Sequence, residues 1–202
     1  MINSDKIIGI MGGTFNPVHK GHVSIARCAY EQSDIDEILF MPSGTPAYKD
    51  TSPIVSASDR CNMVKLAIKP YDYMSLSTIE TERSGNTYTA DTLAQVYDLY
   101  KKIYFIIGAD SLLYIQDWYH PEYICSHCHI LCANRDNNST DTLIKQKHFL
   151  ADKYGAVIDF ISVPDLPYSS TDIRRKVSMG LSVTDDVGKE VEEYIKSRKL
   201  YV

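Results

Sequence analysis

Long hydrophobic runs are absent from this 202-residue chain. No stretch approaches the roughly 18 consecutive apolar residues that a membrane-spanning helix needs, and the apolar run near the N-terminus is too short for a secretory signal. We therefore expect a cytoplasmic protein with no membrane partner. A basic surplus is absent too, because the formal net charge is −5. Proteins that bind nucleic acids generally carry the opposite balance, so no nucleic-acid partner is expected.

Cysteines are few and odd in number: Cys28, Cys61, Cys125, Cys128 and Cys132. An odd count without a secretory signal favours reduced thiols over a disulfide framework. The last three lie among histidines, which raises the alternative of a zinc site. Structural zinc usually takes four ligands from two separated pairs. No second pair exists in the sequence, and Cys132 falls in an expected strand that would turn it away, so we expect structural thiols and no zinc.

Internal repeats, low-complexity tracts and clear linkers are also missing, which favours a single domain spanning residues 1–202. What the chain does have is an alternation of apolar β-like runs with helical periodicity. We expect strands at 6–11, 37–41, 74–79, 103–107, 130–133 and 156–161, and helices at 22–32, 59–68, 89–100, 141–154, 170–179 and 186–197. This pattern predicts an α/β fold with a mainly parallel sheet covered on both faces. Ligands then bind beyond the carboxyl ends of the strands.

The most informative stretch reads GGTFNPVHKGH and joins the first expected strand to the first helix. Gly12 and Gly13 let the backbone approach a ligand closely, and the start of the helix offers unpaired N–H groups to an anion. His19 and His22 are spaced so that a turn can direct both imidazoles into one pocket, where they can hold phosphate oxygens as charge develops. The stretch has neither the Lys-Ser/Thr ending of a Walker loop nor GxGxxG spacing.

A second motif, YSSTDIRRKV, lies near the other end of the chain. Ser169 with Asp172 three residues later is typical of a helix start. Ser170, Thr171 and Arg174 would then present hydroxyls and a guanidinium beside the free amides of the first turn, which together describe a phosphate clamp. The alternative is a capped surface helix with no ligand.

Three further segments bear on a second substrate: GTPAYKD with Lys49, TERSGNTYTADTL, and FIIGADSLLYIQDWY. The last one ends an expected strand at Gly108 and Asp110, where a ligand would sit, and carries the only tryptophan, Trp118. A planar aromatic there can stack on a flat heterocycle, although a partly buried structural tryptophan fits the composition equally well. For Glu80 and Glu82 we expect a structural or loop-ordering role.

The two terminal motifs resemble those of the adenylyl- and cytidylyltransferases with an HxGH motif. The resemblance implies a Rossmann-like, doubly wound fold with ATP lying across the His-Lys-Gly-His turn and the C-terminal helices 170–197 completing the ATP site. It implies that His19 and His22 hold the α- to γ-phosphate region. The other implied phosphate contacts are Gly12, Gly13, Thr14, Phe15, Ser170, Thr171 and Arg174. Tyr168 stands where isoleucine is usual.

The middle segments are similar to the pattern of the bacterial nicotinate-nucleotide adenylyltransferases, PxxPHK, ExxRxGxxYTxDTL and GADxxxxxxxW. This implies that Trp118 stacks on the pyridine ring and that Lys49 helps to bind phosphate. It implies also that backbone amides near Thr87, Tyr88 and Tyr119 receive the carboxylate, and that Gly108 and Asp110 contact the adenosine. Tyr48 replaces the histidine that usually precedes the lysine.

The resemblance predicts an enzyme that joins the adenylyl group of ATP to nicotinate mononucleotide and releases pyrophosphate. The phosphate of the mononucleotide attacks in line, with its charge met by His19, His22, Lys49, Arg174 and a Mg²⁺ ion carried by the ATP phosphates; no protein metal site is expected. Nicotinamide mononucleotide or phosphopantetheine as acceptor, and a non-catalytic nucleotide-binding regulator, are the alternatives. A homo-oligomer is left open.

Overall fold

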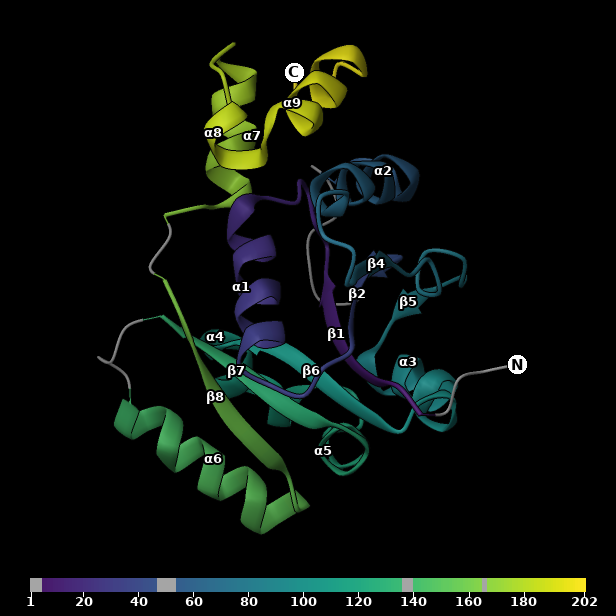
Figure 1. The fold of residues 1–202 in the computed structure, drawn as a ribbon, viewed down its shortest axis with the longest axis vertical. Coiled ribbons are helices and arrows are strands. Elements are labelled where there is room, and N and C mark those ends of the chain that lie inside the picture. The colour runs from purple at the N-terminus through teal and green to yellow at the C-terminus, as the bar shows by residue number, and fades with distance from the viewer. Residues whose placement is uncertain (1–4, 47–53, 136–139, 165–166) are drawn as a thin grey trace. The chain divides into compact units, whose positions relative to one another are not determined.

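The computed structural model describes residues 5–46, 54–135, 140–164 and 167–202. Six strands in these residues form a parallel sheet in the order β4-β2-β1-β6-β7-β8 (Figure 1). The chain runs from β1 outward through β2 and β4, then returns beside β1 with β6 and continues through β7 and β8. This reversal next to β1 is the switch point of a doubly wound fold, so the predicted mainly parallel α/β architecture is confirmed.

The strands of this sheet are β1 (Ile7–Gly13), β2 (Glu37–Pro42), β4 (Met74–Leu76), β6 (Lys102–Gly108), β7 (His129–Arg135) and β8 (Val157–Val163). Two short strands missed in the sequence, β3 (Thr45–Pro46) and β5 (Asn86–Thr87), pair in parallel as a separate sheet. The strand expected at 74–79 is shorter than predicted, because β4 ends at Leu76.

The helices are α1 (Lys20–Glu31), α2 (Ala57–Ile68), α3 (Thr89–Val96), α4 (Ala109–Tyr114), α5 (Pro121–His127), α6 (Thr140–Tyr154), α7 (Ser170–Ser178), α8 (Thr184–Val187) and α9 (Lys189–Ser197). The single helix expected at 89–100 ends at Val96 and continues as the 3₁₀ turn η1 (Tyr97–Leu99). The single helix expected at 186–197 is divided at Gly188, whose φ of 88° breaks the helical path. A second 3₁₀ turn, η2 (Ile115–Asp117), follows α4.

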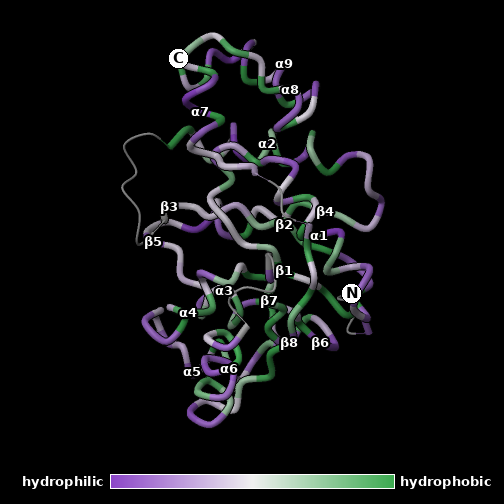
Figure 2. Tube along the Cα trace, turned by 90° about the vertical axis from the view of Figure 1, so that its left-hand side faces the viewer, coloured by the Kyte–Doolittle hydropathy of each residue, from purple (hydrophilic) through white to green (hydrophobic). Residues whose placement is uncertain are grey.

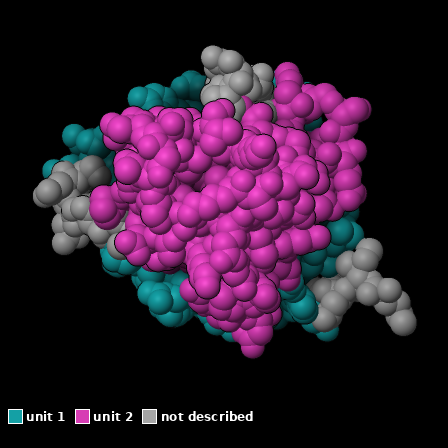
Figure 3. Space-filling model, turned by 90° about the horizontal axis from the view of Figure 1, so that it is seen from above, with its two compact units in different colours: residues 1–12, 25–39, 88–165 teal, residues 13–24, 40–87, 166–202 magenta. Residues whose placement is uncertain are grey.

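The chain divides into two compact units (Figure 3). Unit 1 comprises residues 1–12, 25–39 and 88–165, and unit 2 comprises residues 13–24, 40–87 and 166–202. The single domain expected from the sequence stays a prediction. No helix within the described ranges has the length and apolar character needed to cross a membrane.

The core of unit 1 is built on β6 and β7, two hydrophobic strands that pair in parallel (Figure 2). Residues 103–107 of β6 are buried without interruption, as expected for a strand covered on both faces. The registers align Ile10 of β1 with Phe105 of β6, and Gly108 at the end of β6 with Ala133 of β7. The carboxyl ends of these parallel strands therefore share one edge, and Gly108 there caps the start of α4.

The core of unit 2 brings α2 against α9 and β4. Asp59 near the start of α2 joins the helices, because its carboxylate accepts hydrogen bonds from Tyr194 Oη at 2.8 Å and from Arg198 Nε at 3.3 Å. Ser56 caps α2 and donates its hydroxyl to the same carboxylate at 2.6 Å. These hydrogen bonds, with that of the Ser56 hydroxyl the largest effect, lower the pKa of Asp59.

A second carboxylate, Glu192 of α9, organises the turn before α8. It is only 5% exposed. It accepts hydrogen bonds from the Thr184 hydroxyl, from the Val183 amide at 2.9 Å and from the Ser182 hydroxyl at 2.8 Å, and Lys196 Nζ lies 3.0 Å away. These donors, Thr184 first among them, lower the pKa of Glu192 to about 2. The charged form is thus favoured in the folded protein.

Replacing Glu192 with glutamine is expected to lower the free energy of unfolding at neutral pH by about 2–3 kcal/mol. A carboxylate with a depressed pKa stabilises the fold above its unfolded pKa, and that contribution is lost as pH falls through the folded pKa. The deficit of the variant should therefore shrink between about pH 4.5 and pH 2. Urea unfolding across this range measures it. Glu193→Gln, an exposed carboxylate on the same helix, is the control and should change stability little.

Candidate active site

The histidine loop comprises residues 13–22 of unit 2, which are the last residue of β1, the connection to α1 and the first turn of α1. Phe15 in this loop is buried and has a φ of 49°, a left-handed conformation that a bulky side chain adopts only when its surroundings hold it there. Its ring packs edge-on against His22, with centroids 5.1 Å apart, and contacts Phe40 at a tilt of 43° with centroids 5.6 Å apart. Phe15 thereby fixes the shape of the loop and one side of His22.

The two imidazoles of the histidine loop lie stacked, with ring centroids 3.7 Å apart and planes 24° from parallel. The backbone N–H of His19 donates to Nδ1 of His22 at 3.2 Å. Because Nδ1 accepts this bond, a neutral His22 carries its proton on Nε2, which is then the nitrogen that can donate to an anion. His19 is only 6% exposed.

Gly21 between the two histidines makes this stacking possible. A Cβ at this position would lie 3.0 Å from Nδ1 and 3.2 Å from Cε1 of His19, closer than side chains normally pack. The absence of a side chain therefore gives the buried imidazole its space. The packing of His19 thus explains why glycine occupies this position of the His-Lys-Gly-His sequence.

The helix α7 is held against the histidine loop by two hydrogen bonds to its backbone. The Ser170 hydroxyl donates to the carbonyl of Pro17 at 2.9 Å, and Arg174 Nη1 donates to the carbonyl of Asn16 at 2.9 Å. Arg174 Nη2 also donates to the Thr171 hydroxyl at 3.3 Å. The capping prediction is confirmed, since the Ser169 side chain accepts from the Asp172 amide. Unit 2 therefore brings the two terminal motifs together, while their ligand contacts stay predictions.

Other predicted site residues of unit 2 lie around Gly44. Its N–H donates to the Thr87 hydroxyl at 3.1 Å, and a Cβ on Gly44 would come within 2.4 Å of the Glu80 carbonyl oxygen. Glu80 is buried, and Glu82 accepts from the Thr78 hydroxyl at 2.6 Å. Both observations fit the loop-ordering role expected for these glutamates. The predicted Lys49, with its neighbour Tyr48, lies outside the described residues.

Unit 1 carries the remaining predicted residues. Gly12 near the end of β1 and Gly108 at the end of β6 are exposed, as is Asp110 in the first turn of α4. Trp118 follows η2, half-buried, with its ring edge-on to Phe105 at 6.2 Å. The rings of Tyr119 and Tyr88 lie 4.6 Å apart. The packing on Phe105 orients the indole and fits both readings left open by the sequence, a stacking platform and a structural tryptophan.

The chain matches the cytidylyltransferase-like family over residues 10–176. It is 40% identical over 197 residues to a probable nicotinate-nucleotide adenylyltransferase of Lachnoclostridium phytofermentans, covering 96% of this chain and 98% of that protein. A second relative with the same description, from Caldicellulosiruptor bescii, is 36% identical over 194 residues with the same coverage. The chain belongs to the nicotinate-nucleotide adenylyltransferases. The family and the enzyme class expected from the sequence are confirmed.

Solved structures of this family share the fold. Plasmodium falciparum nicotinic acid mononucleotide adenylyltransferase complexed with APC superposes with a TM-score of 0.76 at 20% identity, covering 97% of each chain. A putative nicotinate-nucleotide adenylyltransferase from Vibrio parahaemolyticus gives a TM-score of 0.66 at 22% identity, covering 97% of this chain and 95% of the other. The Rossmann-like nucleotidyltransferase fold is therefore confirmed.

Three residues missed in the sequence hold the histidine loop of this family member in place. The Asn16 side-chain oxygen accepts from the Val55 amide at 3.2 Å and from the Tyr201 hydroxyl at 2.9 Å. Arg60 of α2 donates to the Thr14 carbonyl at 2.9 Å. A signal for Arg60 was present, since it falls on the apolar stripe of its helix with Met63 and Val64, where a cation is unexpected.

The cysteines fit the structural role expected of them. All five are unpaired and buried. Burial raises the pKa of Cys125 to about 11 and that of Cys132 to about 12, and it raises the pKa of Cys128, whose thiol donates to the Ile124 carbonyl at 3.1 Å. Thiols rather than the thiolates that bind zinc are thus favoured. No group of three or more metal-ligating side chains occurs in the part of the chain that is described.

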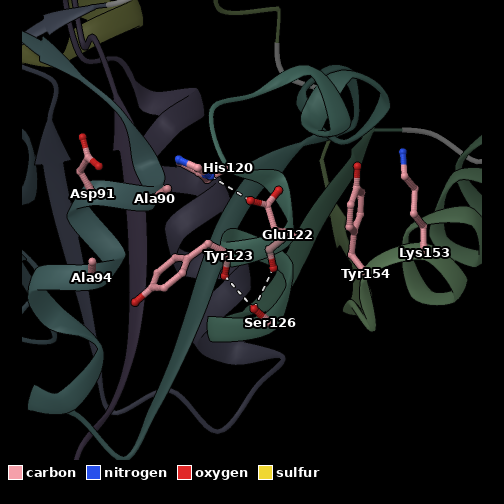
Figure 4. Close-up of a pocket in the computed structure, with 9 residues that line it drawn as sticks. All are labelled: Ala90, Asp91, Ala94, His120, Glu122, Tyr123, Ser126, Lys153 and Tyr154. Atoms are coloured by element: carbon pink, nitrogen blue, oxygen red, sulfur yellow. Dashed lines mark hydrogen bonds and ion pairs between the residues drawn. The ribbon is translucent and has the colours of Figure 1, made fainter.

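Unit 1 also contains a cavity of about 600 Å³ between α3, α5 and α6 (Figure 4). It is lined by Ala90, Asp91, Ala94, His120, Glu122, Tyr123, Ser126, Lys153 and Tyr154. His120 and Glu122 point toward each other there, with Nδ1 and Oε1 2.8 Å apart, and this hydrogen bond lowers the pKa of Glu122. None of the site residues predicted from the sequence lines this cavity.

Proposed function

We propose that this chain transfers the adenylyl group of ATP to nicotinate mononucleotide, forming nicotinate adenine dinucleotide and pyrophosphate. The observation that carries the proposal is the direct attachment of α7 to the histidine loop, through Ser170 and Arg174. It gathers two imidazoles, a guanidinium and a helix N-terminus, the groups that a triphosphate needs, within one unit. A relative of the same fold, the Plasmodium falciparum enzyme, has been solved complexed with NaAD.

In this proposal a phosphate oxygen of the mononucleotide attacks the α-phosphorus of ATP in line. A new P–O bond forms as the bond to the bridging oxygen breaks, and the electron pair leaves with pyrophosphate. The attacking phosphate is already ionised, so no general base is needed. His19 and His22 would neutralise charge that develops near the α-phosphate, and Arg174 would hold the leaving phosphates. Mg²⁺ would come with the ATP substrate as its counterion and would supply further charge neutralisation.

The pyridine side of the site is assigned to residues of unit 1, to Thr87 of unit 2 and to the Lys49 segment. Trp118 would stack on the pyridine ring, with backbone amides of Thr87, Tyr88 and Tyr119 receiving the carboxylate. Asp110 would contact the ribose of the adenosine. Backbone N–H groups are stronger partners for a carboxylate than for a carboxamide oxygen, which supports the acid over the amide nucleotide. The single-domain organisation belongs to this proposal, since both units would serve one pair of substrates.

Replacing Trp118 with alanine is expected to raise KM for nicotinate mononucleotide about tenfold, because an aromatic stacking contact is lost. KM for ATP should change little. Steady-state kinetics with each substrate varied in turn measures both values. Tyr114→Ala removes a 64% exposed aromatic from the neighbouring helix α4 and should leave both constants near normal. An unchanged KM in Trp118→Ala would favour the structural reading of the tryptophan.

The proposed activity is tested by incubating purified protein with ATP and Mg²⁺, together with nicotinate mononucleotide, nicotinamide mononucleotide or phosphopantetheine. Mass spectrometry identifies the product, and a coupled assay follows pyrophosphate. We expect the deamido dinucleotide with the acid nucleotide as the preferred acceptor at equal concentrations. Preference for either other acceptor would correct the substrate, and ATP binding without any product would indicate a nucleotide-binding regulator.

A further inference from the structure

Arg60 is the largest fully buried side chain among the described residues, at 2% exposure. It lies in the first turns of α2 and donates to three backbone carbonyls. Nε donates to Val55 at 3.3 Å, Nη1 to Thr14 at 2.9 Å and Nη2 to Gly44 at 3.1 Å. The flat guanidinium thus bridges three separate chain segments of unit 2. A lysine has donors on one atom only and cannot span three such acceptors.

No carboxylate compensates this buried cation within the described part of the chain. None of the ion pairs found there includes Arg60. The adjacent Asp59 carboxylate is engaged by Ser56, Tyr194 and Arg198 instead. Burial lowers the pKa of Arg60, yet arginine keeps its charge at neutral pH. A buried charge without a counter-charge is costly, and a bound anion nearby offsets that cost.

The three carbonyls place this charge at the histidine loop. Thr14 belongs to the loop itself, and its carbonyl is part of the peptide group that carries the Phe15 N–H. Donation from Arg60 to the carbonyl polarises that peptide and makes its N–H a stronger donor. The Phe15 N–H has no acceptor among the residues that the structure describes. One guanidinium therefore both fixes the loop and strengthens an amide that an anion can use.

The neighbouring contacts tie the same segments a second time. Asn16 accepts from the Val55 amide at 3.2 Å, so the chain at Val55 is linked to the histidine loop by Asn16 as well as by Arg60. The Asn16 carbonyl in turn accepts from Arg174. Replacing Arg60 would therefore alter the histidine loop, to which α7 is bonded through Arg174.

We propose that Arg60 is a positioning residue for the triphosphate of ATP, acting through the Thr14–Phe15 peptide and the anchored histidine loop without touching the nucleotide. The inference rests on the proposed function, since it takes the anion of this loop to be the triphosphate of the adenylyl donor. It assigns to a residue outside the sequence motifs a larger share of the affinity for ATP than of the affinity for the mononucleotide, which Arg60 reaches only through Gly44 and Thr87.

The test compares Arg60→Lys and Arg60→Met with the wild type. Arg60→Lys keeps the charge and loses the three-way bridge, whereas Arg60→Met loses both. We expect KM for ATP to rise about 10-fold in the first and about 100-fold in the second, by analogy with residues that orient metal ligands. KM for nicotinate mononucleotide should change less than about threefold. Lys65→Met, which removes an exposed cation from the same helix, is the matched control and should behave as wild type.

A second readout needs no turnover: the rise in melting temperature caused by ATP or by inorganic tripolyphosphate. It should shrink in both Arg60 variants and persist in Lys65→Met. Wild-type protein that gains stability from ATP but makes no dinucleotide would overturn the proposed function and leave this comparison intact. Three results would overturn the inference and leave Arg60 a structural residue. They are an equal rise in KM for ATP and for nicotinate mononucleotide, an unchanged KM for ATP, and failure of both Arg60 variants to fold.

Discussion

Replacing His22 with alanine is expected to lower turnover by about 10²–10³ without unfolding the protein. The physical reason lies in the tautomer that the structure imposes. Because the His19 N–H donates to Nδ1 of His22 at 3.2 Å, the Nε2–H is the donor, and Phe15 holds the ring from the side. A preoriented donor is most valuable where charge develops in the transition state, so kcat should fall more than KM for ATP rises.

Single-turnover and steady-state rates with saturating ATP and nicotinate mononucleotide measure this effect, with circular dichroism as the check on folding. His148→Ala removes an exposed imidazole from α6 and should retain full activity. His19→Ala is expected to lower turnover by a similar order, but His19 is buried and its loss also removes packing against His22. Near-normal rates in both the His19 and the His22 variant would refute the assignment.

The second large effect is expected for Arg174→Ala, a loss of about 10²–10³ in kcat/KM for ATP. Arg174 uses two nitrogens to hold the Asn16 carbonyl and the Thr171 hydroxyl. An arginine has five N–H donors, so donors remain that can reach phosphate oxygens. The side chain is thus held in place before a ligand arrives, which lowers the entropy cost of binding.

The control for Arg174 is its neighbour on the same helix. Arg175 pairs with Asp172 at 3.0 Å and is exposed, so Arg175→Ala should change neither activity nor stability appreciably. Arg174→Lys should fall between wild type and Arg174→Ala, because lysine keeps the charge but not the fork of donors. Equal activities for the Arg174 and Arg175 alanine variants would show that α7 is only a capped structural helix.

The local structure of the terminal motifs could be predicted because it depends on neighbouring residues, as the Ser169 cap of α7 shows. That their glycines, histidines and Arg174 form an anion site stays a prediction. The parallel sheet could be predicted for a similar reason, since strands such as β6 are apolar throughout. In both cases the deciding interactions are set by neighbours along the chain.

The parts that could not be predicted depend on distant contacts. Arg60 donates to the Thr14 carbonyl and Tyr201 donates to the Asn16 side chain. The residues adjacent to Arg60 and Tyr201 in the sequence do not indicate these distant partners. The pair of two-residue strands, β3 and β5, is too short for any periodic pattern. The break at Gly188 was not predicted either. A glycine is visible there, but the helical pattern on its C-terminal side predicts one continuous helix.

The predicted site residues fall into both compact units. His19, His22, Ser170 and Arg174 belong to unit 2, whereas Asp110, Trp118 and Tyr119 belong to unit 1. Joint action of the two sets on one ATP and one mononucleotide stays a prediction. The expectations for Trp118 and Arg174 test the two sets separately, because the first concerns the mononucleotide and the second concerns ATP.

The most direct measurement is a crystal structure of the protein with Mg²⁺ and an ATP analogue that cannot be cleaved at the α-phosphate. We expect phosphate oxygens within about 3.2 Å of Nε2 of His22 and of the Arg174 guanidinium, on the face of the histidine loop where α7 begins. A triphosphate bound elsewhere, for example in the cavity beside His120 and Lys153, would contradict it.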